Sequence, residues 1–408
     1  MTKLSVKKLK YLILFNNILK TMTDKQIYDP IHEFITITPL MQSIIDTPEF
    51  QRLRDLKQLG AVHYVYPSST HTRFEHSLGV SHLAGIMAEN LAQEMTPAKK
   101  SRFIELVRIA GLIHDIGHGP FSHLYDNQVR SQDEPEHEER GCAIFVDMVK
   151  KYTIRLSKTE VNMILNMVNP SEEYIHDWKY QIVANKQCQL DVDKIDYIQR
   201  DCYHLGLKFG GEWSRLLTHC MVKTTSLGEE IAWPEKLQYE ILQLFSTRYR
   251  LHKQVYNHHT VKAYEYYITE ILRSVNAKID FLDLTDSVVS CRLHKEWRNI
   301  QNKIAKREIP KLVGEKTISN GQFVNEPNPR VVFNIIIDKV TIGFANGDKN
   351  PLNDVWLFNK KNELTHVDST MSLGVPITHR EVILRWYNTV PAKQEEAEEE
   401  WKQYVESL

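Results

Sequence analysis

Hydrophobic positions recur at helical spacing over most of the region between Asp46 and Val275. Apolar side chains three and four residues apart share one face of a helix, so this spacing predicts amphipathic helices. The last such segment is long and contains a stretch rich in histidine and aromatic residues, 249–267. The helices that we expect cover residues 79–93, 102–113, 141–151, 158–168 and 237–273.

The pattern changes after about Ile279. Residues 330–338 and 355–358 are rich in β-branched and aromatic side chains, which is typical of strands, and residues 346–348 have turn chemistry. The charge run 395–400 fits the solvated face of a terminal helix. We therefore predict a mainly α fold, a helical core with a smaller C-terminal α+β lobe. The expected parts are an N-terminal extension (1–24), for which disorder is one interpretation, the core (25–278) and the lobe (279–408).

Length and composition narrow the class of protein. A chain of 408 residues can bury a large core. Its formal net charge of -1 gives no overall basic field for nonspecific nucleic-acid binding, although local patches remain open. No apolar run approaches the ~20 residues that cross a bilayer, so we expect no membrane partner. The 5 cysteines lack a CxxC pair, which favours reduced thiols over zinc fingers or disulfides. An intracellular location, cytoplasmic and/or nuclear, is the prediction.

The densest group of chemically active side chains follows the apolar segment 103–113. Adjacent His114 and Asp115 could supply one nitrogen and one oxygen ligand to a single divalent transition metal. His118 comes one helical turn after His114, so both can face the same cavity. Two glycines and a proline then end the helix, which suits a wall where backbone approaches a ligand.

A His–Asp pair alone is weak evidence of a metal site. A second pair, His176-Asp177, lies in a polar stretch, and we interpret it as surface. The first pair differs because partners occur in distinctive settings elsewhere, a histidine in 72–79 and carboxylates in 190–197. The resulting two-histidine, two-carboxylate site, with room for water or substrate, consists of His76, His114, Asp115 and Asp193.

Several longer patterns occur in order along the chain. They read HxRFEHSLG, HDxGHGPFSH and DVDKxDYxxRDCxHLG, with residues 46–54 before them and 349–351 after them. Together they resemble the HD-domain metal-dependent phosphohydrolases. The chain is most similar to the deoxynucleoside triphosphate (dNTP) triphosphohydrolases related to the protein with a sterile-alpha-motif domain. We expect no counterpart of that domain, because few residues precede Asp29.

The resemblance implies an HD-domain core that cleaves a dNTP into deoxynucleoside and inorganic triphosphate. It implies one iron, zinc or manganese ion on the four residues above, with Mg²⁺ on the triphosphate. Water with a pKa lowered by the metal would attack the α-phosphorus, and His123, oriented by Asp126, would protonate the leaving oxygen. His118 and His137 would touch the phosphates or the attacking water. For each lone histidine, the alternative is a hydrogen-bonded core residue.

The resemblance also implies a substrate-binding set. A triphosphate needs cationic partners in a partly dry pocket. Tyr256 beneath the sugar would exclude a 2′ hydroxyl by steric clash, whereas a packed, salt-bridged helix is the alternative for this segment. The phosphate-binding residues would be Arg73, Lys194, Arg248 and Tyr197. The sugar-binding residues would be Gln58, Leu59, Asp201 and Tyr256, with His252 against the base or the α-phosphate.

Family members that need activation bind a guanine nucleotide near the N-terminus. At the matching positions Asp46, Gln51 and Arg54 would read the base of GTP or dGTP, and Lys25 and Gln26 would face its phosphates. An exposed helix start with a surface salt bridge is the alternative. Basic residues of a second, deoxynucleotide activator site lack counterparts. We therefore expect a guanine-nucleotide-responsive or constitutively active enzyme that forms a homodimer or homotetramer.

Two other functions compete with this one. The first is an HD phosphohydrolase that acts on another nucleotide, such as a monophosphate or a signalling nucleotide. The second is a nucleotide- or RNA-binding protein that kept the metal fold without catalysis. Single-stranded nucleic acid is a further ligand to consider, although no motif supports it.

Overall fold

A computed structural model describes residues 24–209, 211–276, 278–291, 295–318, 334–344, 350–366 and 380–407. Almost all of the expected N-terminal extension lies outside these residues. So do the turn at 346–348, the first part of the expected strand 330–338, and Lys349 of the motif 349–351. Within the described residues helices dominate, and the prediction of a mainly α fold is confirmed.

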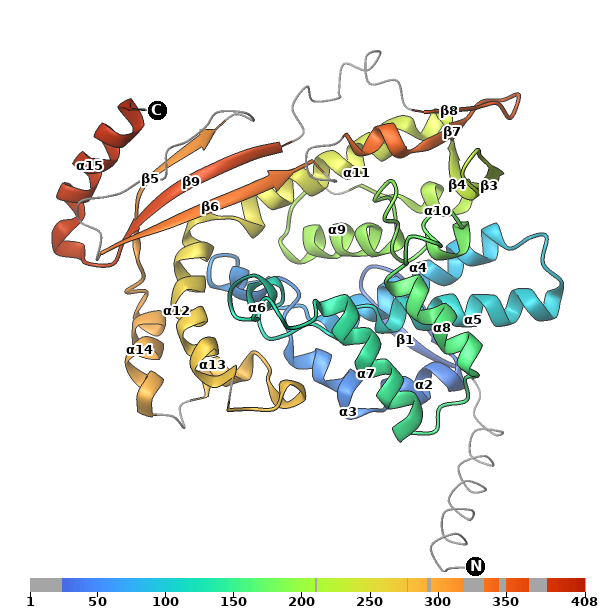
Figure 1. Cartoon of the computed structure of the whole chain (residues 1–408), viewed down its shortest axis with the longest axis horizontal. Helices are drawn as coiled ribbons and strands as arrows, with labels where there is room; N and C mark the ends of the chain where they lie inside the picture. Colours follow the sequence, from blue (N-terminus) through green and yellow to red (C-terminus); the bar gives the residue numbers. More distant parts are fainter. Residues whose placement is uncertain are drawn as a thin grey trace, which may run out of the picture.

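The helical body is built around α4, which packs against α5 and α9, while α5 also packs against α8 (Figure 1). A capping box of Thr72 and Glu75 begins α4, and this cap places His76 in the first turn of the helix. The longer helices are α4 (Arg73–Leu91), α5 (Pro97–Ile113), α7 (His137–Lys151), α8 (Lys158–Val168), α9 (Val192–His204), α11 (Gln238–Leu251) and α12 (His259–Asn276). The others are α2 (Pro39–Ile45), α3 (Pro48–Gln51), α6 (His123–Gln128), α10 (Ser214–Thr218), α13 (Ser287–Ser290), α14 (Arg298–Lys306) and α15 (Gln394–Glu406).

The expected helix 237–273 is broken, so this prediction was wrong in its continuity. A π-helical turn, His252–Tyr256, follows α11, and the chain bends before α12. At the bend the carbonyl of His252 accepts two hydrogen bonds from Asn257, one from the backbone N–H at 3.1 Å and one from Nδ2 at 3.0 Å. Such turns often carry functional side chains.

Three sheets complete the fold. An antiparallel hairpin of β1 and β2, which the sequence pattern did not predict, precedes the helices. The two larger sheets lie at opposite ends of α11 (Figure 1). The hairpin consists of β1 (Lys25–Asp29) and β2 (Glu33–Ile37). One larger sheet has the order β3 (Met221–Thr224), β4 (Glu229–Pro234), β7 (Trp356–Phe358) and β8 (Leu364–His366), and the other β5 (Lys311–Ile318), β9 (Arg380–Asn388) and β6 (Ile335–Gly343).

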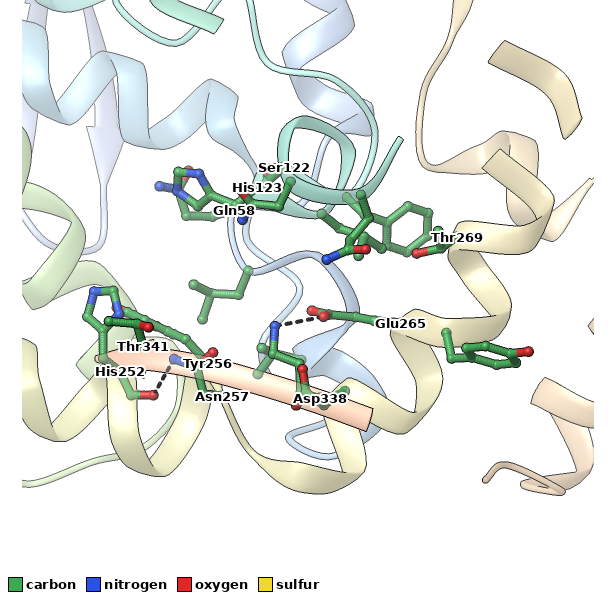
Figure 2. Close-up of a pocket in the computed structure, with 18 of the residues that line it drawn as sticks. Gln58, Ser122, His123, His252, Tyr256, Asn257, Glu265, Thr269, Asp338 and Thr341 are labelled. Carbon is green, nitrogen blue, oxygen red and sulfur yellow. Dashed lines mark hydrogen bonds and ion pairs between the residues drawn. The ribbon is translucent and has the colours of Figure 1, made fainter. Parts of the chain in front are cut away.

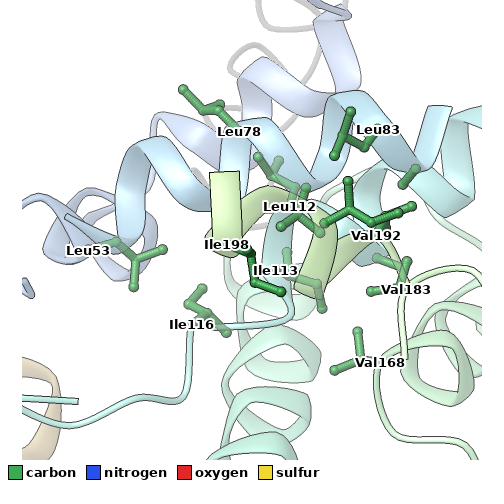
Figure 3. Close-up of a cluster of buried hydrophobic side chains, with 14 of the residues drawn as sticks. Leu53, Leu78, Leu83, Leu112, Ile113, Ile116, Val168, Val183, Val192 and Ile198 are labelled. Carbon is green, nitrogen blue, oxygen red and sulfur yellow. The ribbon is translucent and has the colours of Figure 1, made fainter. Parts of the chain in front are cut away.

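One main hydrophobic core joins the helical body to part of the C-terminal region. Leu78 of α4, Leu112 of α5 and Ile198 of α9 come together at its centre (Figure 3). Val355 and Leu357 belong to the same core, and β4 pairs in parallel with β7. The predicted boundary between residues 278 and 279 therefore lies inside a shared core.

Two composition-based expectations can be compared with the described residues. All 5 cysteines are free thiols, in agreement with the expected absence of disulfides. No described helix combines the length and the apolar character needed to span a bilayer.

Candidate active site

Four side chains from three segments converge where α4, the end of α5 and the start of α9 meet. The Nε2 atom of His76 lies 3.1 Å from Oδ1 of Asp193 and 3.2 Å from Nε2 of His114. His114 Nε2 lies 3.4 Å from Oδ1 of Asp193. Asp115 completes the group, with oxygens 3.5 Å from His76 Nε2 and 3.4 Å from His114 Nε2. The structure thus brings together all four residues expected to bind a metal.

Hydrogen bonds orient both imidazoles toward this group. His76 Nδ1 lies 2.7 Å from Oδ2 of Asp196, and His114 Nδ1 lies 2.8 Å from the carbonyl of Gly111. Because each acceptor takes the Nδ1 proton, each Nε2 offers a lone pair to the centre of the group. His76, His114 and Asp193 form a group that could hold a metal ion, and the carboxylate of Asp115 lies beside it. Two imidazole nitrogens with carboxylate oxygens suit a divalent transition metal.

The charges of the group favour a cation as well. Burial opposes ionisation of Asp115, yet Arg73, His114 and His118 hold the pKa of that carboxyl well below its usual range. Burial likewise opposes protonation of His76, yet Asp193 and Asp196 raise its pKa to about 10. The raised pKa of His76 reflects a negative local field, which attracts a metal ion, and the lowered pKa of Asp115 keeps that carboxylate ionised and available as a metal ligand.

A second cluster of histidines adjoins the first. His118 Nε2 lies 3.2 Å from Oδ1 of Asp115, and the rings of His118 and His137 stack with centroids 4.0 Å apart. Burial and the charges of His118 and Arg73 lower the pKa of His123 to about 3. The structure therefore places the expected catalytic histidines beside the metal residues.

Asp126 does not orient His123 as expected. One of its oxygens accepts a 2.7 Å hydrogen bond from Arg140, and the other lies 3.5 Å from Nδ1 of His118 and 3.6 Å from Nδ1 of His137. Among the described residues no hydrogen bond joins Asp126 to His123. The reason is the start of α6 at His123: this side chain lines a cavity, whereas Asp126 faces α7.

That cavity has a volume of about 920 Å³ and is bordered by α9, α11, α12 and β6. Figure 2 shows Gln58, Ser122 and His123 on one side and His252 and Tyr256 on the other. Asp193 connects the cavity to the metal residues. Of the residues expected to bind substrate, those that line the cavity are Gln58, Leu59, Lys194, Tyr197, Asp201, Arg248, His252 and Tyr256.

Comparison with known proteins assigns the chain to a family. The HD domain model matches residues 73–201. The deoxynucleoside triphosphate triphosphohydrolase SAMHD1 of Bos taurus is 32% identical over 454 aligned residues, which cover 93% of this chain and 77% of the relative. The chain belongs to the SAMHD1 family of HD-domain proteins.

Other members of the SAMHD1 family and of the wider HD group agree with this assignment. SAMHD1 of Homo sapiens is 31% identical, covering 83% of this chain and 66% of its own length. A putative HD domain-containing protein of Acanthamoeba polyphaga mimivirus is 30% identical, covering 82% of this chain and 84% of the relative. The matched HD segment begins at Arg73 and ends at Asp201. It therefore contains the four residues expected to bind a metal, here called the metal-type residues: His76, His114, Asp115 and Asp193. The resemblance seen in the sequence motifs is confirmed.

Arg73 differs from the other residues expected to contact phosphate. Its side chain is 2% exposed and is absent from the cavity wall formed by the described residues. The guanidinium instead pairs with Asp115 and donates a 2.8 Å hydrogen bond from Nε to Ser122. In this SAMHD1-family chain, Arg73 therefore balances the negative charge of Asp115, a metal-type residue.

The sugar-side residues form a connected set. Asp201 accepts hydrogen bonds from the hydroxyl of Tyr256 and, at 2.7 Å, from Nε2 of His71. Gln58 has a buried Oε1 atom that has no hydrogen-bond partner among the described residues, and this side chain borders the cavity. His71 was not among the expected site residues. Its position at the start of the HxRFEHSLG pattern could have indicated that His71 belongs to the site.

Two of the cationic side chains that line the cavity, Lys194 and Arg248, are anchored by neighbouring groups. Lys194 Nζ lies 2.9 Å from Oδ2 of Asp191, the residue that caps α9. Arg248 donates from Nη1 to the carbonyls of Gly343 and Phe344 at 3.3 and 3.2 Å. These contacts fix two positive charges at the cavity wall.

The residues expected to bind a guanine nucleotide are only partly brought together. Gln51 Oε1 accepts a 2.8 Å hydrogen bond from Arg54 Nε, and Asp46 pairs at 2.5 Å with Gln42. Within the described part of the chain, no hydrogen bond or ion pair joins this set to Lys25 or Gln26, which lie on β1. Among the described residues Asp46 and Arg54 form no ion pair with each other.

The second His–Asp pair has a structural role that sequence reasoning missed. His176 is half-buried, with Nδ1 3.1 Å from the buried carboxylate of Glu230. Asp177 caps a short 3-10 helix and accepts a hydrogen bond from Lys179 N. The interpretation of this pair as plain surface was therefore wrong for His176.

Proposed function

We propose that this protein is a metal-dependent dNTP triphosphohydrolase, which converts a dNTP to deoxynucleoside and inorganic triphosphate. The main support is that a metal-type residue, Asp193, borders the same cavity as two anchored cations, Lys194 and Arg248. The SAMHD1 relatives are deoxynucleoside triphosphate triphosphohydrolases, which supports this substrate class and reaction.

The metal would be held by the group of His76, His114, Asp115 and Asp193. A bound divalent ion supplies a Lewis acid and lowers the pKa of water. Nitrogen and carboxylate ligands suit iron, zinc or manganese, whereas Mg²⁺ suits the oxygens of the triphosphate. His118, whose Nε2 lies 3.2 Å from Oδ1 of Asp115, and His137, stacked on His118, are proposed to orient the attacking water.

His123 is proposed as the general acid that protonates the 5′ oxygen of the leaving deoxyribose. In the free protein its pKa is lowered to about 3 by burial and by the charges of His118 and Arg73, so the imidazole is neutral near pH 7. A triphosphate brings several negative charges, which raise the pKa of a neighbouring histidine. Substrate binding itself would thus place the proton on His123.

The sugar side of the cavity is proposed to select deoxyribose. The unpartnered Oε1 of Gln58 can accept a hydrogen bond from a 3′ hydroxyl. Tyr256, held by its hydroxyl on Asp201, would occupy the space of a 2′ hydroxyl. Leu59 and His252 would contact the sugar and base, and Tyr197 the phosphates.

Product analysis tests the proposal. Each dNTP is incubated with enzyme and Mn²⁺ or Mg²⁺, and the products are separated by ion-exchange chromatography. Deoxynucleoside and intact triphosphate are the expected products, and Asp193→Asn is the inactive control. Monophosphate with pyrophosphate would indicate an HD phosphohydrolase of another specificity. No turnover by metal-loaded protein would contradict the proposal.

Regulation by GTP or dGTP is proposed for the site of Asp46, Gln51 and Arg54, with Lys25 and Gln26 on the phosphate side. The Gln51–Arg54 hydrogen bond supports part of this site. The same incubations with and without GTP test it, and Asp46→Asn should lower any response to GTP. Light scattering during these assays tests the expected homodimer or homotetramer.

A further inference from the structure

The turn of the N-terminal hairpin is fixed to α9 by two buried contacts. Asp29 pairs with Arg200 at 2.8 Å and accepts backbone hydrogen bonds from Ile31 and His32. His32 Nε2 lies 2.6 Å from Oδ1 of Asp196. The His32 side chain is 7% exposed and that of Asp196 is 0% exposed, so water competes little for these contacts.

Asp196 is the residue that also orients His76. Its Oδ2 atom lies 2.7 Å from Nδ1 of His76 and 2.9 Å from Nε of Arg200. Its Oδ1 atom accepts from His32 and, at 3.0 Å, from Nη2 of Arg200. Each carboxylate oxygen therefore has two partners, and His32 supplies one of the four.

The same carboxylate is close to the backbone of α4. A Cβ atom at Gly79 would overlap Oδ1 of Asp196 and Nη2 of Arg200. The carboxylate thus has no free space on this side and is held between α4, Arg200 and His32. Burial opposes its ionisation, yet Arg200, His32 and His76 hold the pKa of Asp196 well below its usual range.

We propose that His32 is a positioning residue for the metal site: through Asp196 it fixes the ring of His76, and the hairpin thereby sets metal affinity. The inference rests on the metal site of the proposed function, but not on the dNTP reaction. Partners one step behind a metal ligand commonly change affinity by 10- to 100-fold when removed. His32 is one step further from His76 than Asp196 is, and Arg200 still holds Asp196 without it, so we expect a loss near the lower figure.

The test measures Co²⁺ binding to the full chain, by the visible absorption of the bound ion and by competition with a chelator. His32→Phe keeps the ring volume but removes the donor, and should weaken Co²⁺ about 10-fold and alter the absorption spectrum. His32→Gln keeps a hydrogen-bond donor at a similar distance from the backbone and should restore both the Co²⁺ affinity and the absorption spectrum. His82→Phe is the matched control, because its ring lies 5.5 Å from that of His32 without a hydrogen bond to Asp196.

Wild-type Co²⁺ affinity and spectrum in a folded His32→Phe protein would overturn the proposal. If this variant does not fold, His32→Asn, whose amide is too short to replace Nε2, is compared with His32→Gln in the same way. Equal affinity in that pair would also overturn it. A wild-type protein that binds Co²⁺ but hydrolyses no dNTP would contradict the proposed function and leave the role of His32 standing.

Discussion

At the scale of single residues, His123 allows a test that separates its proposed catalytic role from metal binding. It borders the cavity and is not among the four metal-type residues. We expect His123→Ala to lower kcat by at least about 100-fold, because proton donation to a poor leaving group contributes 10²- to 10⁴-fold. Metal content and dNTP binding should stay near normal. Rapid-quench rates and elemental analysis measure the two effects, with the exposed His219→Ala as the control.

His82 makes a separate prediction about pH. Burial, with the charges of His32 and Arg108 as further causes, lowers the pKa of His82 to about 4. In the unfolded chain the imidazole of His82 becomes protonated near pH 6.5, whereas in the folded protein it stays neutral down to about pH 4. The folded state is therefore fully stable with respect to this group above pH 6.5, and it loses stability as the pH falls toward 4. His82→Gln should remove this dependence, which amounts to about 2 kcal/mol after allowance for partial exposure.

Urea unfolding of both proteins at pH 7 and at pH 4 measures this difference. The free energy of unfolding of His82→Gln should rise relative to that of the wild type as the pH falls. A constant difference between the two proteins across this range would contradict the shifted pKa.

Individual site residues differed in how far the sequence could predict them. His114 and Asp115 were found because adjacent ligands and a helix break lie within one short segment. His32 and His71 were missed, because their importance depends on Asp196 and Asp201, which lie far away in the sequence. Packing of the hairpin on α9 brings His32 to Asp196, and packing of the segment before α4 on α9 brings His71 to Asp201.

At the scale of elements, the contact of α4 with α9 depends on Gly79. We expect Gly79→Ala to destabilise the fold by about 3 kcal/mol, because a methyl group would displace Asp196 and Arg200 from a buried ion-pair network. Gly85→Ala on the same helix is the control, since its methyl group would meet only the flexible side chain of Arg108. Thermal unfolding compares the two variants, and equal melting temperatures would contradict this account.

Elements with regular periodicity were the ones that the sequence predicted well. The helix expected at 158–168 is observed over those residues as α8. The segment 237–273 keeps helical periodicity through the π-turn, so its pattern gave no sign of the break. The hairpin was missed because strands of five residues, 25–29 and 33–37, give too short an alternation.

At the scale of the whole molecule, the helical body and the C-terminal region share one core. Leu352 and Val355 belong to the cluster that includes α4 and α5. We therefore expect one cooperative thermal transition, with equal calorimetric and van't Hoff enthalpies. A chain ending at Lys278 should lack this transition, because β4 would lose its partner β7. Two separate transitions in the full chain would show that the parts fold independently.

The part of the cavity wall that β6 forms has a consequence for how the gene can evolve. Thr341 borders the cavity (Figure 2). The carbonyls of Gly343 and Phe344 hold Arg248. A gene rearrangement that joined this HD segment to a foreign tail would separate a cavity-lining cation from its support. The catalytic segment and its C-terminal partner should therefore pass through evolution as one unit.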